Sequence, residues 1–101
     1  MRPIHLADLD KPRPVLVLTR GAVRAHRSLV TIAPITSRVR GLTTEVWVGP
    51  VNGLEHESVV NLDVIDTIPS IDLGPRLGWF LAEQEAALTE AIHAAFDLVS
   101  A

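Results

Sequence analysis

Hydrophobic and polar positions alternate along the first two thirds of the chain in short runs that turn residues separate. Residues 15–19 are β-branched and apolar on both faces, so they predict a central strand whose entry is fixed by Pro12 and Pro14. Residues 29–35 predict a second strand. Because Pro34 cannot donate a backbone hydrogen bond, we expect it at an edge or a bulge of the sheet.

Two further runs complete the predicted sheet. Residues 43–48 predict a third strand, with Val46 on the opposite face from Trp47. Residues 58–68 alternate with a period of two, which predicts a fourth strand with one face in a core. The alternation is interrupted at residues 65–66, where we expect a bend.

The last segment changes to the three- and four-residue spacing of an amphipathic helix, over residues 83–98. The apolar residues at this spacing are Leu88, Ile92, Ala95, Phe96 and Val99. Upstream, Pro75 and Gly78 are expected to interrupt regular structure. Short antiparallel strands followed by one terminal helix predict an α+β fold, built on a curled antiparallel sheet or partly open β-barrel.

Positive and negative charges are distributed unevenly along the sequence. The 101 residues are the length of one domain, which we expect to span 1–101. The formal net charge of -3 would disfavour nucleic acid. However, residues 1–40 hold eight bases and two acids (8 - 2 = +6), and residues 41–101 hold one base and ten acids (1 - 10 = -9). We therefore expect a surface with one basic pole and one acidic pole.

Several classes of function have no support in the sequence. No secretory signal is visible, and no apolar run approaches the roughly 20 residues that cross a bilayer, so a cytoplasmic protein without a membrane partner is expected. The four histidines share no metal-ligand spacing, and cysteine is absent, so no metal is expected. The glycines form no phosphate-binding loop, so no nucleotide cofactor is expected.

Arginine is the residue type that remains for chemistry. Six arginines precede or flank the first two predicted strands, and in a hairpin they could converge on one side to hold phosphate groups bidentately. They are Arg13, Arg20, Arg24, Arg27, Arg38 and Arg40. Arginines in loops are more often simply solvated, and the sequence leaves both interpretations open.

Three blocks of the sequence resemble the MazF/PemK (Kid) family of toxin endoribonucleases. They are RPVLVLT at residues 13–19, VTIAPITS at residues 30–37, and the stretch from Gly53-Leu54 through Glu57-Ser58-Val59-Val60 to Thr67-Ile68. The resemblance implies an SH3-like, partly open antiparallel barrel with a C-terminal helix. It also implies a homodimer that cleaves single-stranded mRNA, tRNA or rRNA at specific sequences without a metal. A cognate antitoxin with an acidic C-terminal tail would neutralise the toxin, and DNA would be reached only through that antitoxin.

By position, Arg13 takes the place of the family's catalytic arginine and Thr36 that of its catalytic threonine. The 2′-hydroxyl would attack the adjacent phosphate, leaving a 2′,3′-cyclic phosphate and a 5′-hydroxyl, while Arg13 and Thr36 stabilise charge on the phosphate oxygens. The proton acceptor stays open among four residues: His26, His56, Glu57 and Asp66. The residues expected to contact RNA are Pro14, Arg20, Arg24, His26, Ser37, Arg38, Arg40 and Ser58.

The chain departs from the family's pattern at two places. Relatives usually open with a full strand and a longer loop before the Arg-Pro pair, whereas only about a dozen residues precede Arg13 here, so a short flap over the RNA is expected. Asp66 and Pro69 stand where many relatives carry an arginine and an aspartate, which removes a phosphate contact. Two other functions stay open: a non-enzymatic CcdB-like toxin that binds gyrase, and a catalytically inactive RNA-binding module.

Overall fold

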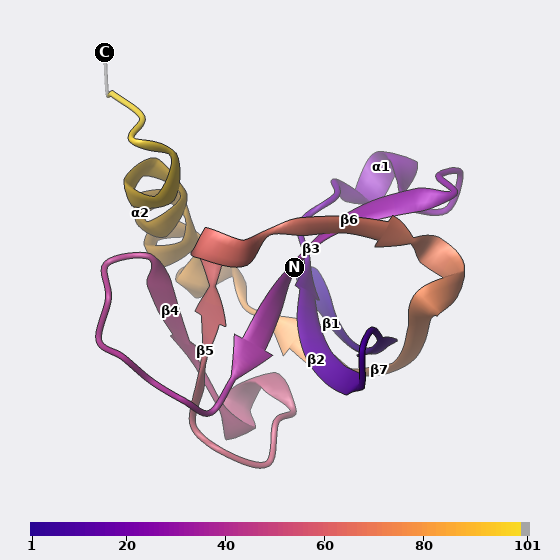
Figure 1. The fold of residues 1–101 in the computed structure, drawn as a ribbon, viewed down its shortest axis with the longest axis horizontal. Helices are drawn as coiled ribbons and strands as arrows, with labels where there is room; N and C mark the ends of the chain where they lie inside the picture. Colours follow the sequence, from indigo (N-terminus) through magenta and orange to yellow (C-terminus); the bar gives the residue numbers. More distant parts are fainter. Residues whose placement is uncertain (100–101) are drawn as a thin grey trace.

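The computed structural model describes residues 1–99, which form a curled antiparallel sheet with a helix packed against it (Figure 1). The strands are β1 (Arg2–Asp8), β2 (Pro12–Val17), β3 (Leu29–Thr36), β4 (Glu45–Val48), β5 (Ser58–Asn61), β6 (Asp66–Pro69) and β7 (Leu73–Phe80). The helices are α1 (Gly21–Arg24) and α2 (Glu85–Phe96), with 3-10 turns η1 (Pro50–Asn52), η2 (Leu62–Val64), η3 (Ser70–Asp72) and η4 (Ala82–Gln84). Among residues 1–99, neither α1 nor α2 combines the length and the apolar character that a membrane span requires.

The strand order is β4-β5-β3-β2-β1-β7, with β6 paired to the first half of β3. β3 changes partner along its length, because residues 29–32 pair with β6 and residues 35–36 pair with β5. Pro34 lies in the interval between these two ladders, so a central strand accommodates it without an edge position or a bulge. The expected α+β fold, an open barrel with a C-terminal helix, is confirmed.

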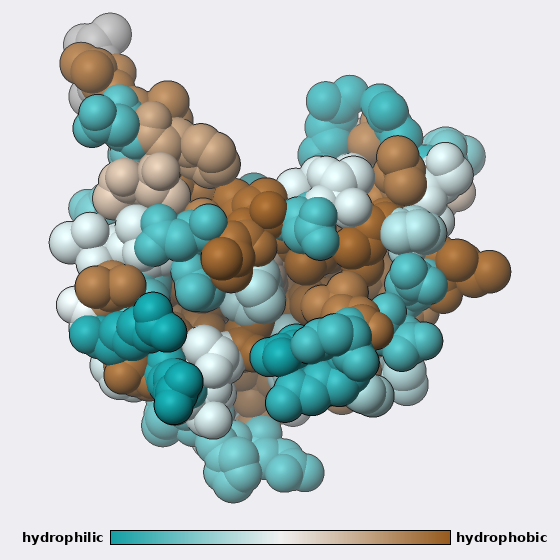
Figure 2. Space-filling view, viewed as in Figure 1, coloured by the Kyte–Doolittle hydropathy of each residue, from teal (hydrophilic) through white to brown (hydrophobic). Residues whose placement is uncertain are grey.

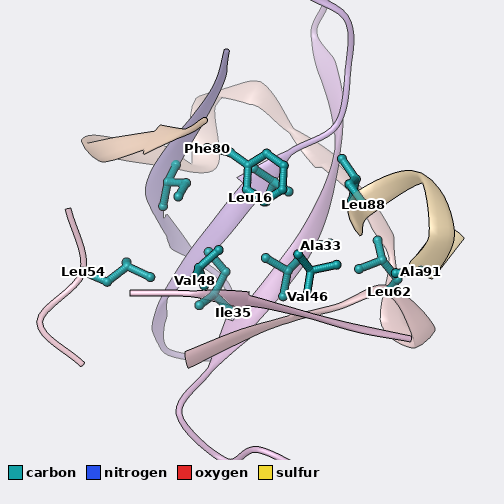
Figure 3. Packing of buried hydrophobic residues seen from close by; sticks show 12 residues of the cluster. Leu16, Ala33, Ile35, Val46, Val48, Leu54, Leu62, Phe80, Leu88 and Ala91 are labelled. Atoms are coloured by element: carbon teal, nitrogen blue, oxygen red, sulfur yellow. The ribbon is translucent and has the colours of Figure 1, made fainter. Parts of the chain in front are cut away.

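Two hydrophobic clusters lie on the two faces of the sheet. The larger one packs Leu16, Phe80 and their neighbours against Leu88 and Ala91 of α2 (Figure 3). The smaller cluster contains Val15 and Val17, together with buried residues of β1, β3 and β6. Because successive side chains of a strand point to opposite faces, β2 supplies both clusters, which explains why its sequence is apolar at consecutive positions.

The N-terminal segment differs from its prediction. It forms a full strand, β1, which pairs with both β2 and β7, and only the loop at residues 9–11 is short. Apolar and polar residues alternate only weakly in β1, so the sequence does not mark it as a strand. The strand is held by backbone hydrogen bonds to a neighbour on each side, and backbone pairing does not depend on a particular side-chain pattern.

Two other boundaries were predicted wrongly. Pro75 and Gly78 lie within β7, and this strand tolerates proline because it is an edge strand that pairs with β1 alone. The bend in residues 58–68 comes earlier, at Leu62–Val64, because the Asn61 side chain accepts a hydrogen bond from the Asp63 backbone N–H at 2.9 Å.

The terminal helix is shorter than expected and only part of its apolar stripe is buried. Leu88 and Ala91 are buried, whereas Phe96 is 55% exposed and Val99, beyond the helix, is 92% exposed. Hydrophobic surface is visible at this end of α2 in Figure 2. This end of the helix therefore lies outside the core of the single chain.

Candidate active site

An open cleft of about 470 Å³ lies where β2 begins and β3 ends. The two strands are antiparallel, and their register places Val15 opposite Pro34, which brings Arg13 opposite Thr36 two residues further on. The loop before β5 forms another wall of the cleft. Six of the residues singled out in the sequence line it: Arg13, Pro14, Thr36, Ser37, His56 and Ser58.

A smaller pocket adjoins this cleft, shares Arg13 and Thr36 with it, and adds Arg38 and Arg40. The loop that carries these two arginines is fixed by Glu45, whose carboxylate accepts the backbone N–H of Arg40 at 3.2 Å and of Leu42 at 3.0 Å. Among residues 1–99, neither Arg38 nor Arg40 has a carboxylate partner within 4.0 Å. Their guanidinium groups are therefore free to bind an anion.

The guanidinium of Arg13 is held by Asp10 in the short loop before β2. Its Nε donates to one carboxylate oxygen at 3.2 Å and its Nη2 to the other at 3.3 Å. These hydrogen bonds, and to a smaller extent one from the Lys11 backbone N–H, lower the pKa of Asp10 below its ordinary value of 3.8. The ion pair is thus present at neutral pH and is lost only as pH falls through that lowered pKa. Arg13 keeps further N–H donors for a ligand.

Thr36 and Ser58 are both engaged in local hydrogen bonds. The Thr36 hydroxyl oxygen accepts the backbone N–H of Arg38 at 3.1 Å, so its own proton remains available for an anion in the cleft. The Ser58 hydroxyl donates to the carbonyl of His56 at 3.0 Å and is largely buried. Thr36 can therefore act on a ligand directly, whereas Ser58 fixes the loop that presents His56.

The base of this loop is fastened to β7 by Asn52, which is 1% exposed. Its amide nitrogen donates to the carbonyl of Trp79 at 2.9 Å, and its oxygen accepts the backbone N–H of Gly49 at 3.0 Å. The Asn52 amide nitrogen also donates to the Gln84 side-chain oxygen at 2.6 Å, and the Gln84 amide nitrogen donates to the Asn52 oxygen at 3.3 Å.

Gly53 adds a second contact between the loop and β7. It approaches Leu77 so closely that a Cβ at Gly53 would lie 2.2 Å from the Leu77 carbonyl oxygen. The wall that carries His56 is therefore rigidly attached.

The six arginines do not converge as expected but form two groups. Arg13, Arg38 and Arg40 lie around the cleft, whereas Arg20, Arg24 and Arg27 lie at or near α1, at the opposite ends of β2 and β3 (Figure 1). Because β2 and β3 are antiparallel, the start of β2 and the end of β3 lie at one end of the pair. The segment that connects the two strands, which carries Arg20, Arg24 and Arg27, lies at the other end. Arg24 also donates to the carbonyl of Thr19 at 3.1 Å, which ties it to its own loop.

The four candidate proton acceptors are also separated. His56 lines the cleft, whereas Glu57 lies in a different pocket beside Gly49. His26 follows α1 at the distant end of the sheet. Asp66 begins β6, where its carboxylate accepts the backbone N–H of Thr67 at 2.8 Å. Of the four, the structure brings only His56 to Arg13 and Thr36.

Sequence reasoning missed two acidic residues near the site. Asp10 holds Arg13, and the three-residue spacing of this pair could have indicated it. Glu55 lines the cleft, and its carboxylate lies 4.0 Å from the imidazole of His56. No local pattern marks Glu55, because its position depends on the long-range attachment of its loop to β7. No group of three or more metal-ligating residues occurs within the part of the chain described.

Comparison with known proteins gives the same family from three directions. The family model described as "PemK-like, MazF-like toxin of type II toxin-antitoxin system" matches residues 4–96. The chain is 62% identical to Endoribonuclease MazF3 of Mycobacterium tuberculosis over 98 residues, covering 97% of this chain and 95% of that protein. It is 34% identical to Probable endoribonuclease MazF5 of the same organism, covering 92% and 85% of the two chains.

Solved structures agree with these relatives. The Mycobacterium tuberculosis toxin MazF-mt6 superposes with a TM-score of 0.95 at 61% identity, covering 98% of this chain and all of that one. An endoribonuclease from a mycobacterial species, solved in complex with its cognate antitoxin, superposes with a TM-score of 0.86 at 26% identity, covering 98% and 95%.

Proposed function

The chain belongs to the family of PemK-like, MazF-like toxins of type II toxin-antitoxin systems, and on this premise we propose that Arg13 and Thr36 form its centre for RNA cleavage. The protein is an endoribonuclease toxin. We propose as its partners RNA, a second copy of the chain and a cognate antitoxin, since solved relatives are complexes of an endoribonuclease with its cognate antitoxin and of MazE with MazF. The observation that carries the proposed site is that two residues of adjacent antiparallel strands line one cleft: Arg13 near the start of β2 and Thr36 at the end of β3.

The chemistry follows from the free donors of these two side chains. A phosphodiester in the cleft would accept hydrogen bonds from the Arg13 N–H groups that Asp10 leaves free and from the Thr36 hydroxyl. Attack by the adjacent 2′-hydroxyl concentrates negative charge on the phosphate oxygens, where each fixed donor is worth about 3–4 kcal/mol in the transition state. The products are a 2′,3′-cyclic phosphate and a 5′-hydroxyl. Because the RNA supplies the nucleophile, the proposed reaction needs no metal.

Single-stranded RNA incubated with the purified protein in EDTA tests this proposal. We expect cleavage at specific sequences with 2′,3′-cyclic phosphate ends, identified by mass spectrometry of the fragments. Fragments with 3′-hydroxyl and 5′-phosphate ends, or activity that returns only with added divalent cation, would contradict the proposed mechanism. Intact RNA under all conditions would contradict the proposed site altogether.

His56 is the proposed acceptor of the 2′-hydroxyl proton, because it alone among the four candidates lines the cleft. We expect His56→Ala to lower the cleavage rate about 10²- to 10⁴-fold, as is usual for loss of a general base. The measurement is a single-turnover rate at one fixed pH, with His26→Ala as a control expected to behave as wild type. A wild-type rate in His56→Ala would assign the proton acceptor to another group, and Glu55, on the same wall of the cleft, is the next candidate.

The two groups of arginines predict different dependences on salt. For an RNA made uncleavable by 2′-O-methylation, each phosphate contact contributes about -0.7 to the slope of log affinity against log salt concentration. We expect Arg38→Ala and Arg40→Ala each to make the slope shallower by about that amount. Arg27→Ala removes the same charge at the distant group and should leave the slope unchanged. Equal changes in all three variants would indicate RNA contact along the whole sheet.

We further propose that residues 1–101 act as one cytoplasmic domain, with DNA reached only through the antitoxin. The second copy is expected to cover the exposed apolar side chains at the end of α2, where Phe96, Leu98 and Val99 leave hydrophobic surface in contact with water. The acidic tail of the antitoxin would compete with RNA for Arg38 and Arg40, because the two ligands share the same charge.

A further inference from the structure

Trp47 lies on β4 at the open edge of the sheet and is 61% exposed. The other aromatic residues are used elsewhere. Phe80 is buried in the core, the ring of Trp79 lies under the guanidinium of Arg76 at 4.6 Å, and Phe96 lies at the end of α2. Trp47 is thus the aromatic side chain that is exposed on the sheet itself.

The register of the sheet places Trp47 in line with the proposed catalytic residues. Val59 of β5 is opposite Thr36 on one side and opposite Trp47 on the other. Directly opposite residues share a face, so Thr36, Val59 and Trp47 form one row across three strands. The neighbouring row, which includes Val60, faces the larger hydrophobic cluster, so the row of Trp47 lies on the other face of the sheet.

The spacing of this row suits a nucleotide. Adjacent strands lie about 4.8 Å apart, so Trp47 is about 10 Å from Thr36 across the sheet. Arg13 continues the row on the other side of Thr36, because the β2–β3 register brings these two residues opposite each other. Val59 lies between Thr36 and Trp47 and is fully buried, so the two flanking side chains are the members of the row that a ligand can contact. The phosphate donors and the exposed indole thereby lie on the same face of the sheet.

We propose that Trp47 is a stacking platform for a base of the RNA, beside the nucleotide whose phosphate lies between Arg13 and Thr36. This inference rests on the proposed function and adds a second contact to it. The arginine loop favours a nucleic acid as the occupant, because Arg38 and Arg40 can bind phosphates on the same face, while the Glu45 carboxylate beside them is committed to backbone N–H groups. Aromatic rings stack on any base, so the platform strengthens binding without selecting a sequence by itself.

The test compares two uncleavable oligonucleotides of equal length, one 2′-O-methyl oligouridine and one with the same backbone but no bases. We expect Trp47→Ala to weaken binding of the oligouridine about 5- to 100-fold, the range found for loss of one stacked base, and to leave binding of the abasic strand unchanged. Trp47→Phe should retain most of the affinity. Ile71→Ala, at another strongly exposed apolar position, is the control and should bind both strands as wild type does.

Three results would overturn the platform. Equal losses on both oligonucleotides would show that Trp47 supports the backbone-binding surface or the fold, and the melting temperature of Trp47→Ala would distinguish these two. Unchanged binding of both would remove Trp47 from RNA recognition. Loss of antitoxin binding with unchanged RNA binding would assign the side chain to a protein partner. If Trp47→Ala binds oligouridine normally while the wild-type protein still cleaves RNA, the platform fails and the proposed function stands.

Discussion

Replacing Arg13 by alanine is expected to lower the rate of RNA cleavage at least about a thousandfold while leaving the protein folded. One fixed donor to a developing oxyanion is worth about 10²- to 10³-fold in rate, and a guanidinium can supply two donors. The fold should survive because Arg13 is partly exposed and its ion pair with Asp10 lies at the surface, where such pairs contribute little to stability. Single-turnover cleavage and a thermal unfolding curve measure the two effects.

Two further variants separate charge from geometry at this position. Arg13→Lys keeps the positive charge but loses the planar fork, so we expect a rate between those of the alanine variant and the wild type. Arg27→Ala removes a charge at the distant arginine group and should cleave at the wild-type rate. If Arg13→Ala fails to fold, the residue is structural; if it folds and still cleaves, the catalytic group lies elsewhere.

Gly53→Ala is expected to destabilise the protein by about 3 kcal/mol. The φ angle of Gly53 is +86°, which costs an L-residue about 1–2 kcal/mol, and the new Cβ would lie 2.2 Å from the carbonyl oxygen of Leu77. Overpacking against backbone adds about 1–3 kcal/mol. For a domain of this size the melting temperature should fall by roughly 12–24 °C. The cleavage rate should also fall at temperatures where the variant is still folded, because the clash moves the wall that carries His56.

Gly41 provides the matched control for this prediction. Its φ angle is +74°, so alanine meets a similar backbone strain there, but no atom lies within 4 Å of a Cβ at that position. We therefore expect Gly41→Ala to lose only about 1–2 kcal/mol. The difference between the two variants measures the contact of the loop with β7. Equal losses would mean that this contact yields easily and does not hold the cleft in shape.

The sequence was informative where structure depends on neighbours in the chain. Alternation in residues 43–48 and the helical spacing of residues 83–98 predicted elements that the structure contains, because both patterns record which side chains of one segment face the core. Prediction failed for β1 and β7, whose stability comes from pairing with distant strands. Pro75 shows the limit clearly, since the same residue can interrupt a strand or occupy an edge that needs no further hydrogen bond.

For the candidate site, the blocks around Arg13 and Thr36 indicated these two residues as candidates but did not indicate their surroundings. Their sequence neighbours Arg20 and Arg24 lie at the distant end of the sheet, while His56, far along the chain, lies in the cleft. Four possible proton acceptors were equivalent in sequence, and three of them lie outside the cleft: His26 and Asp66 belong to other segments of the sheet, and Glu57 lies in the pocket beside Gly49. Residue type and spacing in the sequence could not show which of the four candidates lies beside Arg13.

The sequence by itself determined the class of fold and the family, because these follow from local patterns and short motifs, and it proposed Arg13 and Thr36 as the side chains that stabilise a phosphate. The tertiary structure decided which arginines lie together, which histidine lines the cleft with Arg13 and Thr36, and that Trp47 lies in a row with Thr36. The physical reason is strand register: pairing through backbone hydrogen bonds joins segments far apart in sequence, and the two-residue period of a strand then fixes which side chains share a face.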